Sequence, residues 1–549
     1  MTKPFRRLMP VRALAQAPDQ LAQPEFETSV NDITGALGTI RANDIAPRLS
    51  LRTRLTALLA ILGPGLVVMV GDNDAGGVAT YAQAGQNYGT SLLWTLLLLV
   101  PVLIVNQEMA ARLGMVTGVG HARMIFARFG KFWGAFSAGD LFVLNFLTLV
   151  TEFIGVRLAL GYFGVSPYLS VPLAALLLIG VTVTGSFRRW ERFMFVTIAV
   201  SLLMIPLAFF SHPEAGPIIR DTLVPRVAGG LDATALLVII AIVGTTVAPW
   251  QLFFQQSNVI DKRLVARWIN YERVDTILGS ILTNVGAAAL IIAAAFAFAG
   301  TDLAGGFSDA GAVADGLGRY AGPVAGAFFA IVLLNAALIG AEAVTLSTSY
   351  VFGDVFGVAH SLHRSFREAK LFYGLYSVLV VAAAGIVLIP GAPLGLITVA
   401  VQALAGVLLP SATVFLILLC NDRHVLGPWV NPGWLNLIGS IIVGVLLVLS
   451  FSLAATTLYP DIDLFLLAAG LSCALGLGLV VLGVSQLRAQ RSRGHVEVED
   501  RATWRMRPLE ELPLPVWSAG RRMAMLALRA YLVVAALLLI LRVVQLAFP

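Results

Sequence analysis

The chain has 549 residues, of which 58% are hydrophobic and 12% charged, and its mean hydropathy is +0.85. Soluble domains carry about 25% charged residues, so this composition excludes an ordinary soluble protein and predicts an integral membrane protein. The net charge of +6 would suit a nucleic-acid partner, but the basic residues gather in loops between apolar stretches. We therefore expect membrane lipid, and no nucleic acid, as a partner.

Apolar stretches that can cross a bilayer, which takes about 20 residues, recur along nearly the whole chain. We predict an all-α fold with about thirteen transmembrane helices, at 57–88, 91–113, 134–163, 169–186, 193–211, 232–258, 274–299, 321–352, 371–390, 393–419, 433–456, 462–487 and 523–547. The expected segments are a polar cytoplasmic tail at 1–50, a transporter-like core at 51–456, an additional helix at 457–487, a cytoplasmic linker at 488–522 and a last helix at 523–549. The tail lacks the pattern of a removable signal peptide.

Basic residues lie in every second loop between these stretches, and the loops between them are short or acidic. Cytoplasmic loops of membrane proteins carry an excess of Lys and Arg. This pattern predicts a multi-pass protein of the plasma membrane with a cytoplasmic N-terminus and an external C-terminus.

The first apolar stretch is interrupted by GDNDAGG, residues 71–77. A membrane helix satisfies its own backbone hydrogen bonds, so such an interruption is tolerated only where it is buried in protein or lines an aqueous cavity. An ionisable residue such as Asp74 would be costly against lipid, which makes it a candidate functional residue.

A second interruption lies in the sixth stretch, at AIVGTTVAPWQLFFQQSN, where Pro249 removes a backbone donor. The two interruptions are five spans apart, so each could begin a unit of five spans. Because five is odd, the second unit would begin on the opposite side of the membrane from the first. Paired broken spans are typical of inverted-repeat secondary transporters with a site near the membrane midplane. The alternative is a pair of flexible hinges in a channel or a structural bundle.

Three segments resemble the Nramp family of divalent metal transporters. GPGLVVMVGDNDAGGVATYAQAG is similar to its first span, RLGMVTG to the loop after its second span, and VQALAGVLLPSATVFLILLCNDR with NPGWLNLIG to its tenth span and the next loop. The resemblance covers about residues 55 to 456. It implies a LeuT-like 5+5 inverted-repeat fold with a metal site between the unwound centres of spans one and six. No phosphate-binding loop or nucleophile–base set stands out, so we predict neither an enzyme nor a cofactor.

The two family signatures are altered in this chain. Asp-Pro-Gly-Asn is replaced by Asp74-Ala75-Gly76-Gly77, and Met-Pro-His-Asn by Ala248-Pro249-Trp250-Gln251. Methionine sulfur is a soft ligand that favours transition metals, whereas Mg²⁺ is hard and keeps several waters. Gly77 and Ala248 are expected to enlarge the cavity. The pattern resembles the Nramp-related magnesium transporter branch, in which the sixth-span methionine is also absent.

The resemblance implies a set of oxygen ligands for the transported ion. Asp74 is the central ligand, the carbonyls of Gly71 and Thr245 are oxygen donors, and Gln251 is a direct or water-mediated ligand. Gln402 in span ten is either a ligand or a structural residue. We expect Trp250 to pack beside the cavity rather than to bind the ion.

The resemblance also implies a broken proton relay. The sixth-span histidine positions of the family carry Trp250 and Gln255, and the second acidic position of the third span carries Gly155. Glu152 keeps the first acidic position, where it either carries protons through water or pairs with Arg157. We expect ion flux that is uncoupled or weakly coupled to protons and driven by the membrane potential.

The sequence allows two roles for each of two other carboxylates. Asp72 either lines the entrance to the site or caps the half-helix that follows it. Glu342 in span eight either lines the aqueous path or accepts hydrogen bonds from Thr345 or Ser347.

Together these features predict a secondary transporter that moves Mg²⁺ into the cytoplasm, with Mn²⁺ as a competing ion. One alternative is a broad-range divalent or trivalent metal transporter with proton coupling. Another is a sodium-coupled organic-solute carrier on the same fold, although the charge of Asp74 argues against an anionic substrate. A third is a membrane protein that binds metal without transporting it. The sequence does not predict the oligomeric state.

Overall fold

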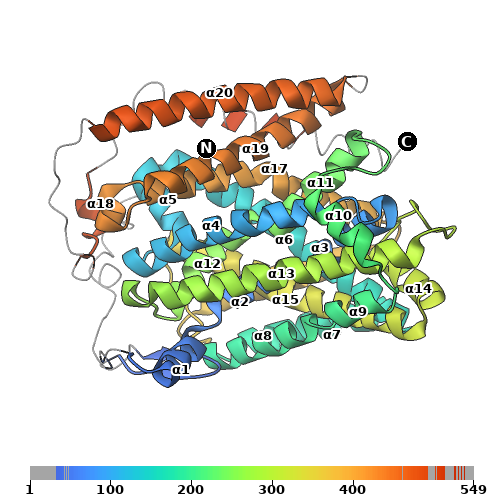
Figure 1. The fold of residues 1–549 in the computed structure, drawn as a ribbon. Coiled ribbons are helices and arrows are strands. Elements are labelled where there is room, and N and C mark those ends of the chain that lie inside the picture. The colour runs from blue at the N-terminus through green and yellow to red at the C-terminus, as the bar shows by residue number, and fades with distance from the viewer. Residues whose placement is uncertain are drawn as a thin grey trace, which may run out of the picture.

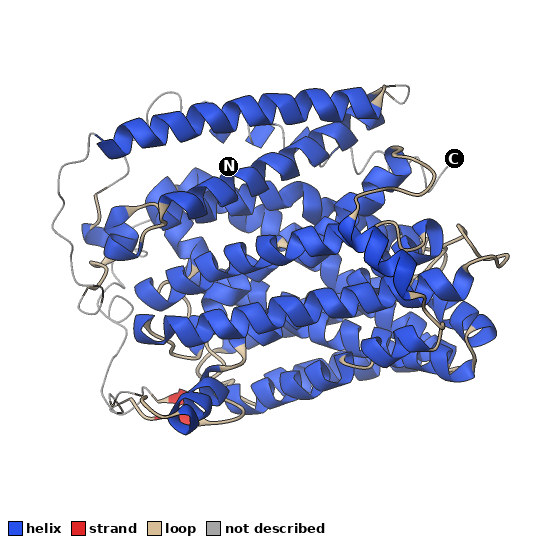
Figure 2. Ribbon diagram, viewed as in Figure 1, coloured by secondary structure: helices blue, strands red, loops and turns tan. Residues whose placement is uncertain are grey.

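Nearly every apolar stretch of the sequence folds as an α-helix, and most of these helices run side by side in one bundle (Figures 1 and 2). The computed structural model describes residues 32–459, 462–491 and 501–513, except 43, 45, 47, 502 and 503, together with scattered positions between 525 and 537. Helix is the expected form because an apolar segment in lipid must pair its backbone groups internally.

Ten apolar segments make up two successive units of five. The first unit contains α2 (Pro64–Val70) with α3 (Ala75–Tyr88), α4 (Leu93–Thr117), α6 (Lys131–Tyr162), α7 (Pro167–Thr182), and α8 (Phe187–Ser201) with α9 (Met204–Phe209). The second contains α11 (Ala233–Thr246) with α12 (Pro249–Asp261), α13 (Ile269–Phe298), α15 (Pro323–Phe356), α16 (Lys370–Val387) and α17 (Leu394–Cys420). Each unit therefore begins with a broken helix, as the sequence predicts.

The remaining elements precede, connect or follow the two units. They are β1 (Ile33–Thr34), β2 (Thr39–Ile40), α1 (Leu51–Ile61), α5 (His121–Phe129), α10 (Ala215–Leu223), η2 (Ala266–Trp268), α14 (Ala310–Tyr320), α18 (Arg423–Leu426), η3 (Gly427–Trp429), α19 (Gly433–Leu458), α20 (Leu464–Arg491) and η4 (Leu509–Glu511). The two strands pair antiparallel, with Ile33 opposite Ile40. Helix α20 packs along α19 at one side of the bundle (Figure 1).

The prediction of about thirteen spans is not confirmed. Within the described residues, nine helices are long and apolar enough to cross a membrane, or ten if α1 and α2, bent by 51°, form one span. The break shortens α3 to 14 residues, and α7 and the apolar part of α20 are also short. The predicted span at 523–547 lies largely outside the described residues.

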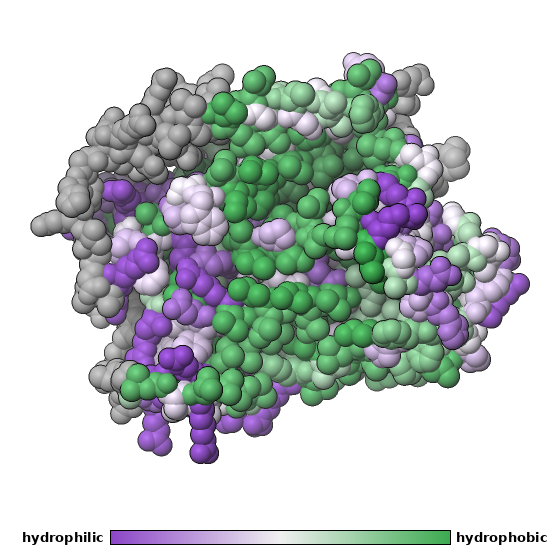
Figure 3. Space-filling view, in the orientation of Figure 1, coloured by the Kyte–Doolittle hydropathy of each residue, from purple (hydrophilic) through white to green (hydrophobic). Residues whose placement is uncertain are grey.

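The surface of the bundle has the pattern of a membrane protein. A hydrophobic band covers its middle, and hydrophilic side chains gather at the two ends of the helices (Figure 3). Large apolar side chains such as Leu98, Leu176 and Val378 are exposed, as expected for helices that contact lipid rather than water.

The two broken helices pack against each other in opposite senses. The first half of one contacts the second half of the other, α2 with α12 and α3 with α11, while α13 lies against both α2 and α3. Helices α6, α15 and α17 complete the surroundings of α3. This arrangement places the two breaks together inside the bundle.

Helix α2 is held at its beginning by a carboxylate of α13. Asp275 accepts hydrogen bonds from the backbone N–H groups of Gly63 and Gly65 at 3.0 and 2.7 Å, and from that of Leu66 at 3.1 Å. Free N–H groups at a helix start need such acceptors. Close by, Lys262 Nζ forms a buried ion pair with Glu191 at 2.6 Å and donates to the Leu62 carbonyl.

Candidate metal-ion site

The first break is stabilised by two carboxylates. Asp74 is the N-cap of α3, and its Oδ1 accepts a hydrogen bond from the Gly77 N–H at 2.6 Å. The Ala75 N–H, which would donate to the Gly71 carbonyl in a continuous helix, instead donates to Glu152 Oε2 at 3.0 Å. The break therefore releases the Gly71 carbonyl from its helical partner.

The second break is caused by proline. In a continuous helix the Thr245 carbonyl would accept from the N–H of residue 249, but Pro249 has none. Ala248 is extended, with ψ of 148°, and its N–H donates to Gln251 Oε1 at 3.1 Å. Each break thus frees a carbonyl at a position that the resemblance assigns to the ion.

Gly77 marks the place where the two breaks meet. A Cβ atom built on it would lie 2.8 Å from Thr245 Oγ1, 3.0 Å from the Asp72 carbonyl and 3.4 Å from Asp74 Oδ1. A side chain at this position would therefore point into the predicted site. The expectation that Gly77 leaves open space is wrong for this conformation, because the Thr245 hydroxyl and the Asp72 backbone occupy it.

Gln402 joins the site directly from α17. Its Nε2 donates to Asp74 Oδ1 at 3.3 Å. Gly76 permits this approach, since a Cβ at that position would lie 1.6 Å from the Gln402 amide nitrogen. The structure thus places Gln402 against the predicted central ligand.

Gln251 reaches the site but uses its oxygen elsewhere. Besides the Ala248 N–H, its Oε1 accepts from Gln107 Nε2 at 3.2 Å. A direct bond to an ion would require this oxygen to leave the start of α12, so a water-mediated role fits the observed geometry better.

Asp72 does not cap a half-helix, because Asp74 fills that position. Its side chain is completely buried, and neither of its carboxylate oxygens has a hydrogen-bond partner. It lies near the Gln251 amide, and its nearest charged neighbour is Asp74, which has the same sign.

Glu152 belongs to the site, whereas its predicted partner does not. The Glu152 carboxyl lies next to Asp74, and both contact the position of Gly340 in α15. The alternative pairing with Arg157 is wrong, because Arg157 Nη1 donates to the Val387 carbonyl at 2.8 Å.

Glu342 lies apart from this cluster. Its Oε2 accepts from Thr182 Oγ1 of α7 at 2.7 Å. The predicted partners are wrong, because Thr345 has no hydrogen bond to it and Ser347 donates to the Trp250 carbonyl at 3.1 Å. Glu342 is therefore a buried residue of the α7–α15 contact.

Trp250 packs beside the site, as expected. Its ring is buried against Phe254, with ring centroids 6.2 Å apart, and its edge lies 3.5 Å from a Cβ built on Gly71. It fills the volume behind the first break.

Sequence reasoning missed two polar contributions to the site. Gln107 of α4 contacts Gln251. The Tyr81 hydroxyl and Thr246 Oγ1 lie 2.8 Å apart and join α3 to α11. The signal for Gln107 was the polar sequence VNQE inside the apolar second span.

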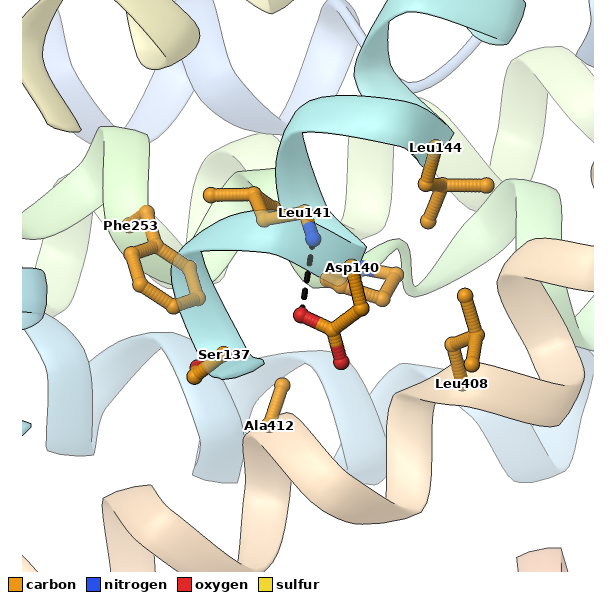
Figure 4. Close-up of a pocket in the computed structure, with 8 residues that line it drawn as sticks. Ser137, Asp140, Leu141, Leu144, Phe253, Leu408 and Ala412 are labelled. Atoms are coloured by element: carbon orange, nitrogen blue, oxygen red, sulfur yellow. Dashed lines mark hydrogen bonds between the residues drawn. The ribbon is translucent and has the colours of Figure 1, made fainter. Parts of the chain in front are cut away.

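The site is closed in this conformation. Asp74, Glu152 and Gln402 are all buried. One cavity borders the first break and is lined by Asn73, Met204 and Gly286. Another borders the second break and is lined by Pro249, Asp140 and Leu408 (Figure 4). In the described part of the chain, no three His, Cys, Asp or Glu residues form a group that could hold a metal ion. An ion here would rely on carboxylates together with neutral oxygens.

Comparisons with known proteins show which family the chain resembles. The family model Nramp, described as natural resistance-associated macrophage protein-like, matches residues 65–456. The divalent metal cation transporter MntH of Bacillus subtilis is 26% identical over 73% of this chain and 93% of its own length. The MntH of Ralstonia nicotianae is 30% identical over 68% of this chain and 86% of its own length.

A solved structure shares the fold. The manganese transporter of Eremococcus coleocola, crystallised with an aromatic bis-isothiourea compound, superposes with a TM-score of 0.60. It is 21% identical, and the match covers 84% of this chain and all of that chain. This similarity confirms the predicted LeuT-like transporter architecture.

Proposed function

Since the chain belongs to the Nramp family of metal transporters, we propose that its main cargo is Mg²⁺, carried into the cytoplasm across the plasma membrane without obligatory proton coupling. The proposed ligands are Asp74 and the carbonyls of Gly71 and Thr245, with Gln402 beside Asp74 and Gln251 acting through water. Each of these residues lies at or beside one of the two breaks.

The observation that carries the proposal is the all-oxygen composition of the site. Position 248 is the N-cap of α12, three residues after the freed Thr245 carbonyl, and alanine there offers no sulfur. Position 77 points between the breaks, and glycine there offers no carboxamide. A site of carboxylates, carbonyls and water suits a hard cation that keeps part of its hydration shell.

The absence of an obligatory proton step is supported by the residues at the former relay positions. Trp250 is a packing residue, and Gln255 Nε2 donates to Glu272 Oε1 at 2.8 Å. Neither side chain changes its charge at physiological pH. The membrane potential then drives entry, with about 4.6 kcal/mol per 100 mV for a divalent ion.

A manganese carrier is the second candidate. Its support comes from the relatives, whose names state divalent metal or manganese transport, and from Glu152, which keeps a carboxyl beside Asp74. That carboxyl offers a place for a proton near the cargo.

Ion uptake into proteoliposomes separates the two candidates. Mg²⁺ and Mn²⁺ influx would be measured under a negative-inside potential for the wild type and for Asp74→Ala, with an internal pH indicator. We expect Mg²⁺ influx that requires Asp74 and no fixed proton stoichiometry. Mn²⁺ influx with proton entry and without Mg²⁺ influx would establish the second candidate instead.

A further inference from the structure

Asp72 has a local environment that the assigned ligands do not explain. It lies in the break between α2 and α3, completely buried, with both carboxylate oxygens unpaired. None of the ion pairs found within the described residues includes Asp72 or Asp74. A buried carboxylate without a partner is rare in folded proteins, because it loses its water without replacement.

Other unpaired polar atoms lie around Asp72. Gln251 Nε2 is beside it, and Gln107, bonded to Gln251, has a free Oε1. Thr245 Oγ1 is also buried and unpaired, at the position where the two breaks meet. These atoms come from α4 and from both breaks, and they are linked pairwise: Gln251 lies beside Asp72, Gln107 is bonded to Gln251, and Thr245 Oγ1 lies with the Asp72 backbone around Gly77.

We propose that Asp72 and Gln107 form a second subsite that binds the cation cargo through its water shell. The proposal rests on the function given above and adds a further carboxylate to the site. Asp74 already accepts hydrogen bonds from Gly77 and Gln402, so one oxygen is partly engaged. Neither Asp72 oxygen makes a hydrogen bond of normal geometry, and the Gln251 amide lies beside this carboxylate.

The free groups match what a hydrated cation presents. Water bound to a cation directs its hydrogens outward, so its neighbours must accept hydrogen bonds. Asp72 Oδ1, Asp72 Oδ2 and Gln107 Oε1 are acceptors without donors. Mg²⁺ usually keeps several waters when it binds protein, and hydrogen bonds from such waters to a carboxylate are charge-assisted.

The charge of Asp72 also favours a divalent ion electrostatically. Of the two carboxylates already at the site, Glu152 accepts the Ala75 N–H and Asp74 accepts from Gly77 and Gln402. Asp72, two residues from Asp74 in the same break, adds a carboxylate that makes no hydrogen bond and would strengthen the attraction for a divalent ion in a low-dielectric interior. In the absence of an ion, the carboxylates of Asp72 and Asp74 repel each other, so the cargo would favour the closed arrangement.

Asp72→Asn tests this subsite with little change in shape. Initial uptake rates of Mg²⁺ and Mn²⁺ would give KM and Vmax at fixed potential, and melting with and without added Mg²⁺ would report binding to the purified protein. We expect the variant to raise the KM for Mg²⁺ about tenfold, with a smaller change for Mn²⁺, which sheds water more readily. The Mg²⁺-dependent rise in melting temperature should shrink.

Asp140→Asn is the matched control. Asp140 is another carboxylate inside a span, and its Oδ1 accepts from the Leu141 N–H (Figure 4). It lines a cavity with Pro249 and Phe253 of α12. Each of these two residues is two positions from Gln251, or about 200° around the helix, so the cavity lies on the side of α12 opposite Gln251. Its KM for both ions should equal that of the wild type.

Two results would overturn the subsite. One is an unchanged KM for both ions in Asp72→Asn, with or without a loss of proton movement. The other is an equal rise in KM in Asp140→Asn. If Asp72→Asn fails to fold, Gln107→Leu replaces it. We expect this variant to raise the KM for Mg²⁺ about threefold. An unchanged KM in Gln107→Leu would count against the subsite. A wild type that carries Mn²⁺ but no Mg²⁺ would refute the proposed cargo, whereas a raised KM for Mn²⁺ in Asp72→Asn would still support the subsite.

Discussion

The two helix breaks at the centre of this protein each free a backbone carbonyl, but different residues cause them. The first is rich in glycine and is held open by carboxylates, with Asp74 capping α3 and Glu152 taking the Ala75 N–H. The second contains no charge and is opened by Pro249, with the Gln251 amide taking the Ala248 N–H. The first break therefore supplies negative charge to the site, whereas the second supplies neutral oxygen atoms and side chains that shape the site.

This division indicates which property each break controls. Affinity for any cation should depend mainly on the first break, because its carboxylates provide the long-range attraction. Selection among cations should depend mainly on the second, because the identity of a neutral ligand distinguishes hard from soft ions. Substitutions can test the two assignments separately.

The largest effect is expected from Asp74→Asn. Asparagine is as good an N-cap as aspartate, so α3 should still begin at Ala75 while the charge is lost. We expect uptake of every divalent ion to fall by at least about 100-fold, since removing one partner of a buried charge interaction costs about 3–5 kcal/mol. Radiotracer or fluorescence uptake in proteoliposomes would measure this fall.

Melting of the same variant separates charge from structure. Asp74→Asn should retain the melting temperature of the wild type without metal, whereas Asp74→Ala should also lose about 1 kcal/mol of capping free energy. Equal destabilisation by both substitutions would show that Asp74 mainly holds the fold together.

A smaller effect is expected from Pro249→Ala. Alanine restores an N–H that can donate to the Thr245 carbonyl, so α11 and α12 can join and the carbonyl becomes unavailable to the ion. We expect uptake to fall about tenfold, the effect of one lost hydrogen-bond-strength interaction. Uptake kinetics for Mg²⁺ would measure the fall.

Pro172→Ala is the control for that substitution. Pro172 also lies inside a helix, but it is exposed on α7, away from both breaks. Uptake should be unchanged there. Loss of uptake in both proline variants would mean that helix stiffness in general, rather than the Thr245 carbonyl, limits transport.

Ala248→Met tests selection at the second break. The thioether adds a soft ligand beside the freed carbonyl, so we expect the ratio of Mn²⁺ to Mg²⁺ uptake to rise about fivefold. Ala248 is buried, so the larger side chain should also cost about 1–3 kcal/mol of stability. Competition between the two ions for uptake would measure the ratio.

Ala289→Met provides the matched overpacking control. Ala289 is a buried alanine of α13, and methionine there should lower stability without changing the ion ratio. A similar change in ratio from both variants would assign the effect to packing instead of to the sulfur.

The sequence predicted the features that depend on local chemistry. Both breaks and the position of Asp74 at the first follow from residues within a few positions of each other, whereas the Thr245 carbonyl was named only because the family resemblance implied it. Trp250, expected to pack beside the cavity, lies against Phe254 and near Gly71 of the glycine-rich break.

The sequence did not predict contacts between distant segments. Nothing near Glu342 indicates Thr182 as its partner, and nothing near Glu152 indicates the Ala75 N–H, because both pairings depend on how helices pack. The closed space at Gly77 was missed for a related reason. A missing side chain was expected to leave a void, but close packing brings the Thr245 hydroxyl into its place.

The smallest effect is expected from Glu152→Gln. Its amide oxygen can still accept from the Ala75 N–H, so the first break should keep its shape while a titratable group beside Asp74 is removed. If transport is uncoupled from protons, Mg²⁺ uptake should change by less than about twofold, and its rate should stay level between about pH 5.5 and 8 in both proteins. Simultaneous recording of ion and proton flux would check this. A wild-type proton flux that disappears in Glu152→Gln would instead show that the first break carries protons as well as the charge for the cation.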